Sequence, residues 1–219
     1  QSIDAATIYD VPKLMKEEQL DKVVLKKLDL NHIGEADITC WEEFVYNLNN
    51  PKNAVDIALV GKYVELKDSY KSISESFIHA SSVTRCKVNL HWMHSEKLDD
   101  VSAIESLKDM DGVLVAPGFG PRGIEGKLHA VRYARENNIP FFGICLGMQI
   151  SVIEYARNVL NYEGANSSEM NSKSAYPVID IMEEQKKITH MGGTMRLGSC
   201  SCELKKGSIA HAVYGVDRI

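Results

Sequence analysis

The residue best suited to covalent chemistry is Cys145, which stands between two glycines in the run Gly143-Ile144-Cys145-Leu146-Gly147. A short apolar run precedes it and an amphipathic pattern follows it, which predicts a strand that turns directly into a helix. Small flanking residues permit the strained turn, a nucleophile elbow, that exposes a nucleophile at the edge of a sheet. The start of a helix favours the thiolate, and the N–H of Leu146 can face a developing oxyanion. We therefore predict a nucleophilic cysteine; the alternative is a buried structural cysteine at the end of a core strand.

A glycine-rich loop, Pro117-Gly118-Phe119-Gly120-Pro121-Arg122-Gly123, forms the second candidate site and follows an apolar strand pattern. Its glycines match G-x-G-x-x-G, but a dinucleotide site, as in an NAD-dependent oxidoreductase, also needs an acidic residue after the next strand. Cys145 occupies that region instead. The loop is better interpreted as the second half of an oxyanion hole, because glycine lets a backbone N–H approach a reacting carbonyl closely. A purely structural tight turn is the alternative.

The elements around these motifs alternate between short apolar runs and helical periods from Ala54 onward, which is typical of a parallel sheet covered on both faces. Strands are expected at 55–60, 87–93, 112–116 and 140–144, and helices at 70–82, 102–108, 124–137 and 147–160. The apolar side of the last helix is predicted to comprise Met148, Val152, Ile153, Ala156, Val159 and Leu160. Farther along, we expect a strand at 178–181, a solvated turn at 183–187 and a returning strand at 194–197.

The first fifty residues differ from the rest and predict a helical arm without visible chemistry. Pro12 opens a helix whose apolar face continues through Leu28. A second short helix contains Trp41 and Leu48 and ends at Asn49-Asn50-Pro51.

Composition excludes several classes of protein. Apolar residues make up 44% of the 219 residues and charged residues 25%, which is ordinary for a globular chain with a sizeable core. The net charge of −5 gives no basic footprint for a nucleic acid, and no apolar run is long enough to cross a membrane. The five cysteines are odd in number and form no C-x-x-C pair, so we expect neither a disulfide framework nor a metal site. A cytoplasmic protein is expected.

Several motifs of the chain point to one family. They are Ile8-Tyr9-Asp10-Val11-Pro12, Val60-Gly61-Lys62-Tyr63-Val64, the glycine-rich loop, Gly143–Gln149, Ala165–Glu169 and Met191–Gly198. Together these motifs resemble the class I glutamine amidotransferase domain of the CTP synthase family. The resemblance covers nearly the whole chain and implies an α/β fold, with an open, mostly parallel, flavodoxin-like sheet and helices on both faces. It also implies that residues 1–53 are a linker arm from a preceding amidoligase domain and that 54–219 form a C-terminally incomplete amidotransferase domain.

The resemblance also implies roles for individual residues. Cys145 would form a γ-glutamyl thioester, with oxyanion N–H groups from Gly118 and Leu146. Gln149 and Glu169 would hold the amino acid end of glutamine, where a carboxylate suits the ammonium group; the alternative for Glu169 is an exposed loop carboxylate. Phe119 would wall the pocket. The substrate-binding residues expected in all are Gly118, Phe119, Leu146, Gly147, Met148, Gln149 and Glu169.

The resemblance further implies partners and cofactors. Ammonia released from L-glutamine would aminate UTP to CTP in the covalently linked amidoligase domain, which uses ATP and Mg²⁺. The glutaminase domain itself needs no cofactor, GTP is the expected activator, and the full-length enzyme is expected to be a homotetramer. The run from Gly192 to Gly198 would belong to a mobile lid. One departure is Pro117, which stands where the family usually has glycine and removes one N–H donor.

The acid–base partner of the cysteine is missing from the sequence. The family uses His-Pro-Glu, in which the glutamate orients the imidazole, and none of the seven histidines is followed by Pro-Glu. His94-Ser95-Glu96 has the right spacing but lies upstream of Cys145, and we do not assign Arg218 to the family's substrate-binding arginine. We therefore expect a chain that stops before its last catalytic strand and has impaired glutaminase activity. The alternative is a non-catalytic module that keeps the glutamine pocket.

Overall fold

A four-stranded parallel sheet forms the centre of the protein. The computed structural model describes residues 4–30, 33–118, 120–182 and 198–219. The strands follow the order β2-β1-β3-β4, and all three pairings are parallel, which confirms the predicted architecture. Each expected strand is present to within two residues at either end. The strands are β1 (Asn53–Gly61), β2 (Cys86–His94), β3 (Gly112–Val115) and β4 (Phe141–Gly143).

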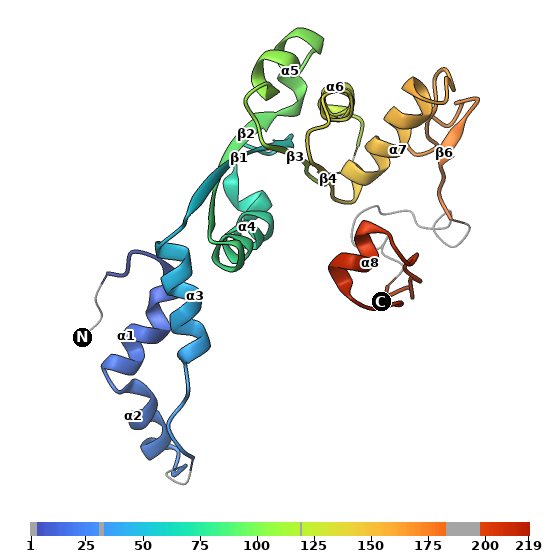
Figure 1. The fold of residues 1–219 in the computed structure, drawn as a ribbon. Coiled ribbons are helices and arrows are strands. Elements are labelled where there is room, and N and C mark those ends of the chain that lie inside the picture. Colours follow the sequence, from blue (N-terminus) through green and yellow to red (C-terminus); the bar gives the residue numbers. More distant parts are fainter. Residues whose placement is uncertain (1–3, 31–32, 119, 183–197) are drawn as a thin grey trace.

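Helices cover both faces of this sheet (Figure 1). Leu59 and Leu114 pack toward α4, whereas their neighbours Val60 and Val115 belong to the core formed with α6 and α7. The alternation follows from the pleat, which sends successive side chains to opposite faces. The helices of this part are α4 (Lys71–Thr84), α5 (Asp100–Leu107), α6 (Ile124–Glu136) and α7 (Leu146–Asn158), with short 3₁₀ turns η2 (Lys67–Tyr70) and η3 (Ser95–Lys97).

The N-terminal arm consists of η1 (Ile8–Asp10), α1 (Val11–Glu17), α2 (Leu20–Lys27) and α3 (Thr39–Asn49), and extends away from the sheet (Figure 1). The prediction of one helix from Pro12 through Leu28 is wrong. The helix breaks at Gln19, whose φ is +55°. The break lets apolar side chains of both halves gather around one hollow with Ile33 and Ile38, a tertiary contact that helical periodicity does not encode.

Hydrogen bonds of two aromatic side chains stabilise the arm: one lies within the arm, and the other joins it to α4 of the sheet domain. The indole N–H of Trp41 donates to the carbonyl oxygen of Tyr9 at 2.8 Å, and the Tyr9 hydroxyl donates to Glu75 on α4. Burial is the main reason that the pKa of Tyr9 rises to about 12, and the Glu75 carboxylate adds to the rise.

The buried face of α7 differs from the predicted one. Ile150, Ile153 and Ala156 are buried, but Met148, Val152, Val159 and Leu160 are between 37% and 49% exposed. Apolar residues occupy more than half of the helix circumference, so the sequence pattern does not select one face. The packing of α7 against β3 and α6 determines which of its faces is buried.

The C-terminal part adds two short strands and one short helix. The strand expected at 178–181 is β6 (Pro177–Ile179), which pairs with β5 (Asn166–Ser167), a strand that the sequence did not predict. α8 (Ile209–Tyr214) follows. The expected turn at 183–187 and the expected strand at 194–197 lie outside the described residues. Within the described ranges, no helix has the length and apolar character needed to span a bilayer.

Candidate active site

Cys145 occupies the sharp turn between β4 and α7, as the elbow pattern predicts. Its backbone angles are φ +53° and ψ −107°, a combination that is strained for a residue with a side chain. α7 begins at the next residue, so the amides of its first turn lack helical partners and point toward the elbow. The thiol side chain is exposed. Strain, exposure and a helix N-terminus therefore coincide at this cysteine.

The glycines on either side of the elbow are required by close backbone approaches. A Cβ at Gly147 would lie 2.2 Å from the carbonyl oxygen of Val115, and one at Gly143 would lie 2.5 Å from the carbonyl carbon of Gly147. These contacts let α7 begin directly against β3. The G-x-C-x-G spacing therefore has a steric reason at both positions.

A small hollow of about 100 Å³ opens beside Cys145. It lies far below the roughly 300–1,000 Å³ of pockets for drug-sized molecules, so it suits a small ligand. Its lining residues are Gly118, Gly120, Pro121, Cys145, Leu146, Gln149, Glu169 and Met170.

Five of the eight residues expected at the site lie in this lining. Two others do not: Gly147 is buried against β3, and the Met148 side chain is 49% exposed on α7 without lining the hollow. Phe119 lies outside the described residues. Gly120, Pro121 and Met170 are additional lining residues.

The loop facing Cys145 begins at the end of β3. Gly118 has φ +154°, which residues with a side chain rarely adopt, and a Cβ there would lie 3.1 Å from Cε of Lys62. Pro117 has no N–H, so it cannot act as a donor at this point. Glycine is therefore needed at position 118, where the backbone both lines the hollow and lies close to the Lys62 side chain.

Glu169 reaches the hollow from the turn after β5. Its backbone N–H donates to the hydroxyl of Ser167 at 3.2 Å, and Ser167 is only 2% exposed. The Glu169 carboxylate itself is exposed. The buried Ser167 therefore fixes the backbone of a carboxylate residue that lines the hollow.

Two lysines that sequence reasoning missed lie beneath the loop. Lys127 on α6 is fully buried and Lys62 is 5% exposed. The Nζ of Lys127 donates to the carbonyl oxygen of Ala116 at 2.9 Å. The pKa of Lys127 is lowered to about 8, mainly by burial and in addition by the charge of Lys62, while a negative charge on Cys145 acts in the opposite direction. The sequence did carry a signal for this burial. Lys127 lies three residues after Ile124 and directly before Leu128, so it shares the apolar face of the helix with both.

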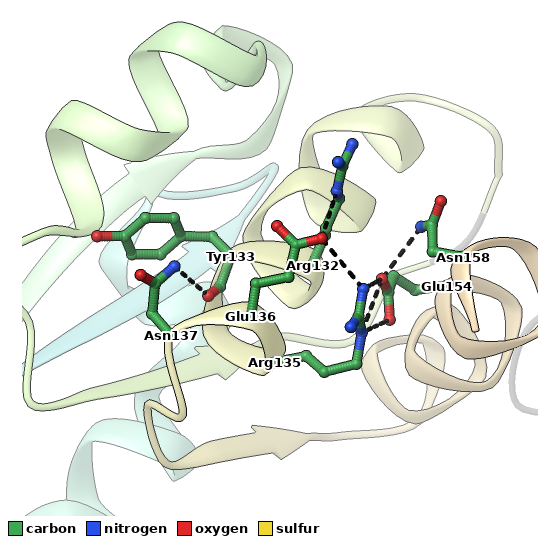
Figure 2. Close-up of polar contacts among 7 residues, drawn as sticks. All are labelled: Arg132, Tyr133, Arg135, Glu136, Asn137, Glu154 and Asn158. Atoms are coloured by element: carbon green, nitrogen blue, oxygen red, sulfur yellow. Dashed lines mark hydrogen bonds and ion pairs between the residues drawn. The ribbon is translucent and has the colours of Figure 1, made fainter.

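An ion pair between the buried Glu154 and the partly exposed Arg135 positions α7, the helix that begins at the elbow (Figure 2). Glu154 is 1% exposed and accepts hydrogen bonds from Nε and Nη2 of Arg135 at 2.8–3.1 Å. Asn158 donates a further one at 3.0 Å. The pair joins α6 to α7 and so fixes both helices behind the site.

None of the described histidines lines the hollow. His94 ends β2, and two strands, β1 and β3, separate β2 from β4. At about 4.8 Å per strand, His94 lies roughly 14 Å from the elbow strand. Its Nε2 is 3.5 Å from Glu65, while Glu96 pairs with Arg122. This arrangement argues against the His94-Ser95-Glu96 alternative.

The other histidines either have partners away from the hollow or lie outside the residues that the structure describes. His129 faces the carbonyl oxygen of Leu98, and His211 pairs with Asp217 near the C-terminus. His190 falls outside the described residues. The described part of the site thus holds an exposed cysteine as the candidate nucleophile, candidate oxyanion donors and a carboxylate.

The family model for glutamine amidotransferase class-I matches residues 65–217. The chain belongs to this family. Curated relatives include CTP synthases from Flavobacterium psychrophilum, 63% identical over 98% of this chain, and from Christiangramia forsetii, 60% identical over all of it. The chain spans about 40% of the length of these relatives.

A solved structure agrees with this family assignment. The Trypanosoma brucei CTPS glutaminase domain with bound acivicin superposes with a TM-score of 0.67 at 38% identity. The match covers 75% of this chain and 64% of that one. The resemblance that the sequence motifs indicated is therefore confirmed for the family and for the fold.

Proposed function

We propose that this amidotransferase chain hydrolyses L-glutamine to glutamate and ammonia through a thioester on Cys145. The observation that carries the proposal is the hollow shared by Cys145, Gly118, Leu146 and Glu169. It combines a nucleophile, backbone donors and a carboxylate around a space for a small ligand. The acivicin-bound glutaminase domain among the relatives supports a ligand of amino acid size.

In this proposal the reaction has two steps, the formation of the thioester and its hydrolysis. The Cys145 thiolate attacks the γ-carboxamide carbon, and the N–H groups of Gly118 and Leu146 stabilise the negative charge on its oxygen. The carbon–nitrogen bond then breaks, and the nitrogen leaves as ammonia after taking a proton from a general acid. Water hydrolyses the thioester, which releases glutamate and restores the cysteine. Glu169 binds the substrate ammonium and Gln149 its carboxylate end.

For the full-length protein we propose that the ammonia aminates UTP to CTP. The CTP synthase relatives, of which the chain spans about 40%, support this proposal. The reaction would use ATP and Mg²⁺ in a linked amidoligase domain, with residues 1–53 as the connecting arm and GTP as activator. A cytoplasmic homotetramer belongs to the same proposal.

The test compares the natural full-length protein with two cysteine variants. Acivicin should form a one-to-one covalent adduct at Cys145, detected by mass, and Cys145→Ala should abolish both this adduct and glutamate release. Cys40→Ala, which removes an exposed cysteine of the arm, should change neither. An adduct that survives Cys145→Ala would refute the nucleophile assignment, and glutamine binding without glutamate release would favour the non-catalytic module.

A second assay tests the use of ammonia. The Cys145→Ala protein should form CTP from added ammonium chloride but not from glutamine. Loss of both activities, in a protein with a normal unfolding curve, would contradict the proposed division between two domains.

A further inference from the structure

Lys62 belongs to the motif Val60–Val64, which the proposed reaction leaves without a role, and it follows β1 directly beside the glycine-rich loop. Just before this point the chains pair through their backbones, as in the hydrogen bond from the N–H of Ala116 to the carbonyl oxygen of Val60 at 2.9 Å. The N–H of Lys62 donates instead to the hydroxyl of Tyr70 at 3.3 Å, and Tyr70 is only 3% exposed. A buried side chain therefore fixes the backbone of Lys62 next to the loop.

The side chain of Lys62 packs against Gly118. A Cβ at Gly118 would lie 3.1 Å from Cε of Lys62 and 3.9 Å from both its Cγ and its Cδ, so three carbons of the stem lie against this glycine. Lys62 is 5% exposed and does not line the hollow beside Cys145, whereas Gly118 does. Lys62 therefore supports, from behind the hollow, the residue to which we assign an oxyanion donor.

The ammonium group of Lys62 lies over the ring of Tyr63. Its Nζ is 5.3 Å from the ring centroid, within the range of a cation–π contact. Tyr63 is 42% exposed, so the charged end reaches a partly exposed ring while the stem stays buried. The guanidinium carbon of Arg122, at the far end of the glycine-rich loop, lies 5.8 Å from the same centroid. The ring therefore holds the direction of the Lys62 side chain and joins it to the loop.

We propose that Lys62 is a positioning residue for the hydrolysis of glutamine: its buried stem holds the Gly118 backbone at φ +154° and so keeps the Gly118 N–H in place for the developing oxyanion. The inference rests on the proposed glutaminase function. It gives one reason for two residues, because a side chain at position 118 would enter the space that the Lys62 stem fills.

The experiment measures kcat and KM for glutamine hydrolysis by the natural full-length protein with GTP present. Lys62→Ala removes the stem, whereas Lys62→Met keeps a chain that extends to Cε but has no ammonium group. The matched control is Lys67→Ala: Lys67 is exposed, and its Nζ lies 5.9 Å from the centroid of the Trp92 ring. This control removes a comparable cation–π contact from a lysine that is not packed on Gly118. Urea unfolding of each variant accompanies the kinetics.

Lys62→Ala should lower kcat about 10–100-fold with little change in KM, because a displaced oxyanion donor weakens binding of the transition state more than binding of the substrate. Lys62→Met should keep most of kcat, because methionine fills similar space. Lys67→Ala should leave both kcat and KM unchanged.

Three results would overturn the inference. They are an unchanged kcat in Lys62→Ala, an equal loss of kcat in Lys62→Ala and Lys62→Met, and a rise of KM alone, which indicates a role in substrate binding instead. If Lys62→Ala does not fold, Lys62→Leu fills the core but lacks a carbon at Cε, and an unchanged kcat in that variant has the same meaning. Absence of glutamate release by the unaltered protein would instead refute the proposed function on which the inference rests.

Discussion

Removal of the Arg135 guanidinium should strongly destabilise the protein, because it leaves the buried Glu154 carboxylate without its main partner (Figure 2). Glu154 is 1% exposed and would retain only the neutral hydrogen bond from Asn158. An uncompensated buried charge of this kind costs about 3–5 kcal/mol. Domains of this size have a total free energy of unfolding of about 5–15 kcal/mol, so Arg135→Met should remove a large part of it.

The assay is a double-mutant cycle followed by urea unfolding. Arg135→Met and Glu154→Met should each destabilise the protein, whereas the double variant should lose less stability than the two single losses added together, because two apolar side chains replace the pair. We expect a coupling free energy of about 2–3 kcal/mol. The control is Arg132→Met: Arg132 forms an exposed i,i+4 pair with Glu136, which should contribute less than about 0.5 kcal/mol.

The same cycle tests whether the pair positions Cys145. α7 begins directly after Cys145 and contacts α6 through this pair, so Arg135→Met should also slow acivicin addition, and the double variant should restore the rate. The reasoning is refuted if Arg135→Met costs less than about 1 kcal/mol, or if the double variant is as unstable as the two single variants summed.

Three further predictions concern the elbow, the arm and the substrate pocket. Gly147→Ala, whose Cβ would lie 2.2 Å from the Val115 carbonyl oxygen, should abolish acivicin addition and lower the unfolding midpoint, whereas Gly34→Ala, with no atom within 4 Å of its Cβ, should change neither. The pKa of Tyr9 rises from 10.0 to about 12 on folding, so its stabilising contribution is complete below pH 10 and is lost as the pH rises to 12. The free energy of unfolding in urea should therefore be lower at pH 11.5 than at pH 9, and Tyr9→Phe should lack this part of the decrease. An equal decrease in the variant would contradict the assignment of the effect to Tyr9. Glu169→Gln should raise KM for glutamine about 10–100-fold with a smaller change in kcat, and an unchanged KM would remove Glu169 from the substrate site.

The sheet and the elbow could be predicted because their signals are local. The apolar runs that became β1 and β3 alternate with helical periods, and a parallel sheet is the arrangement that buries such runs on both faces. The glycines around Cys145 mark a turn that other residues cannot enter without clashes. The break at Gln19 and the pairing of β5 with β6 escaped prediction, because each depends on a contact between separate segments.

The sequence by itself determined the chemistry available to this protein: a cysteine between two glycines, a glycine-rich loop after the preceding strand, and motifs shared with glutamine amidotransferases. The tertiary structure alone decided which side of α7 is buried, that Glu169 reaches the same hollow as Cys145, and that Lys127 is buried with its Nζ bonded to the start of the loop. The physical reason is that a residue's own type and neighbours set its reactivity and its local conformation. Burial and through-space electrostatics depend instead on segments that are far apart in the chain.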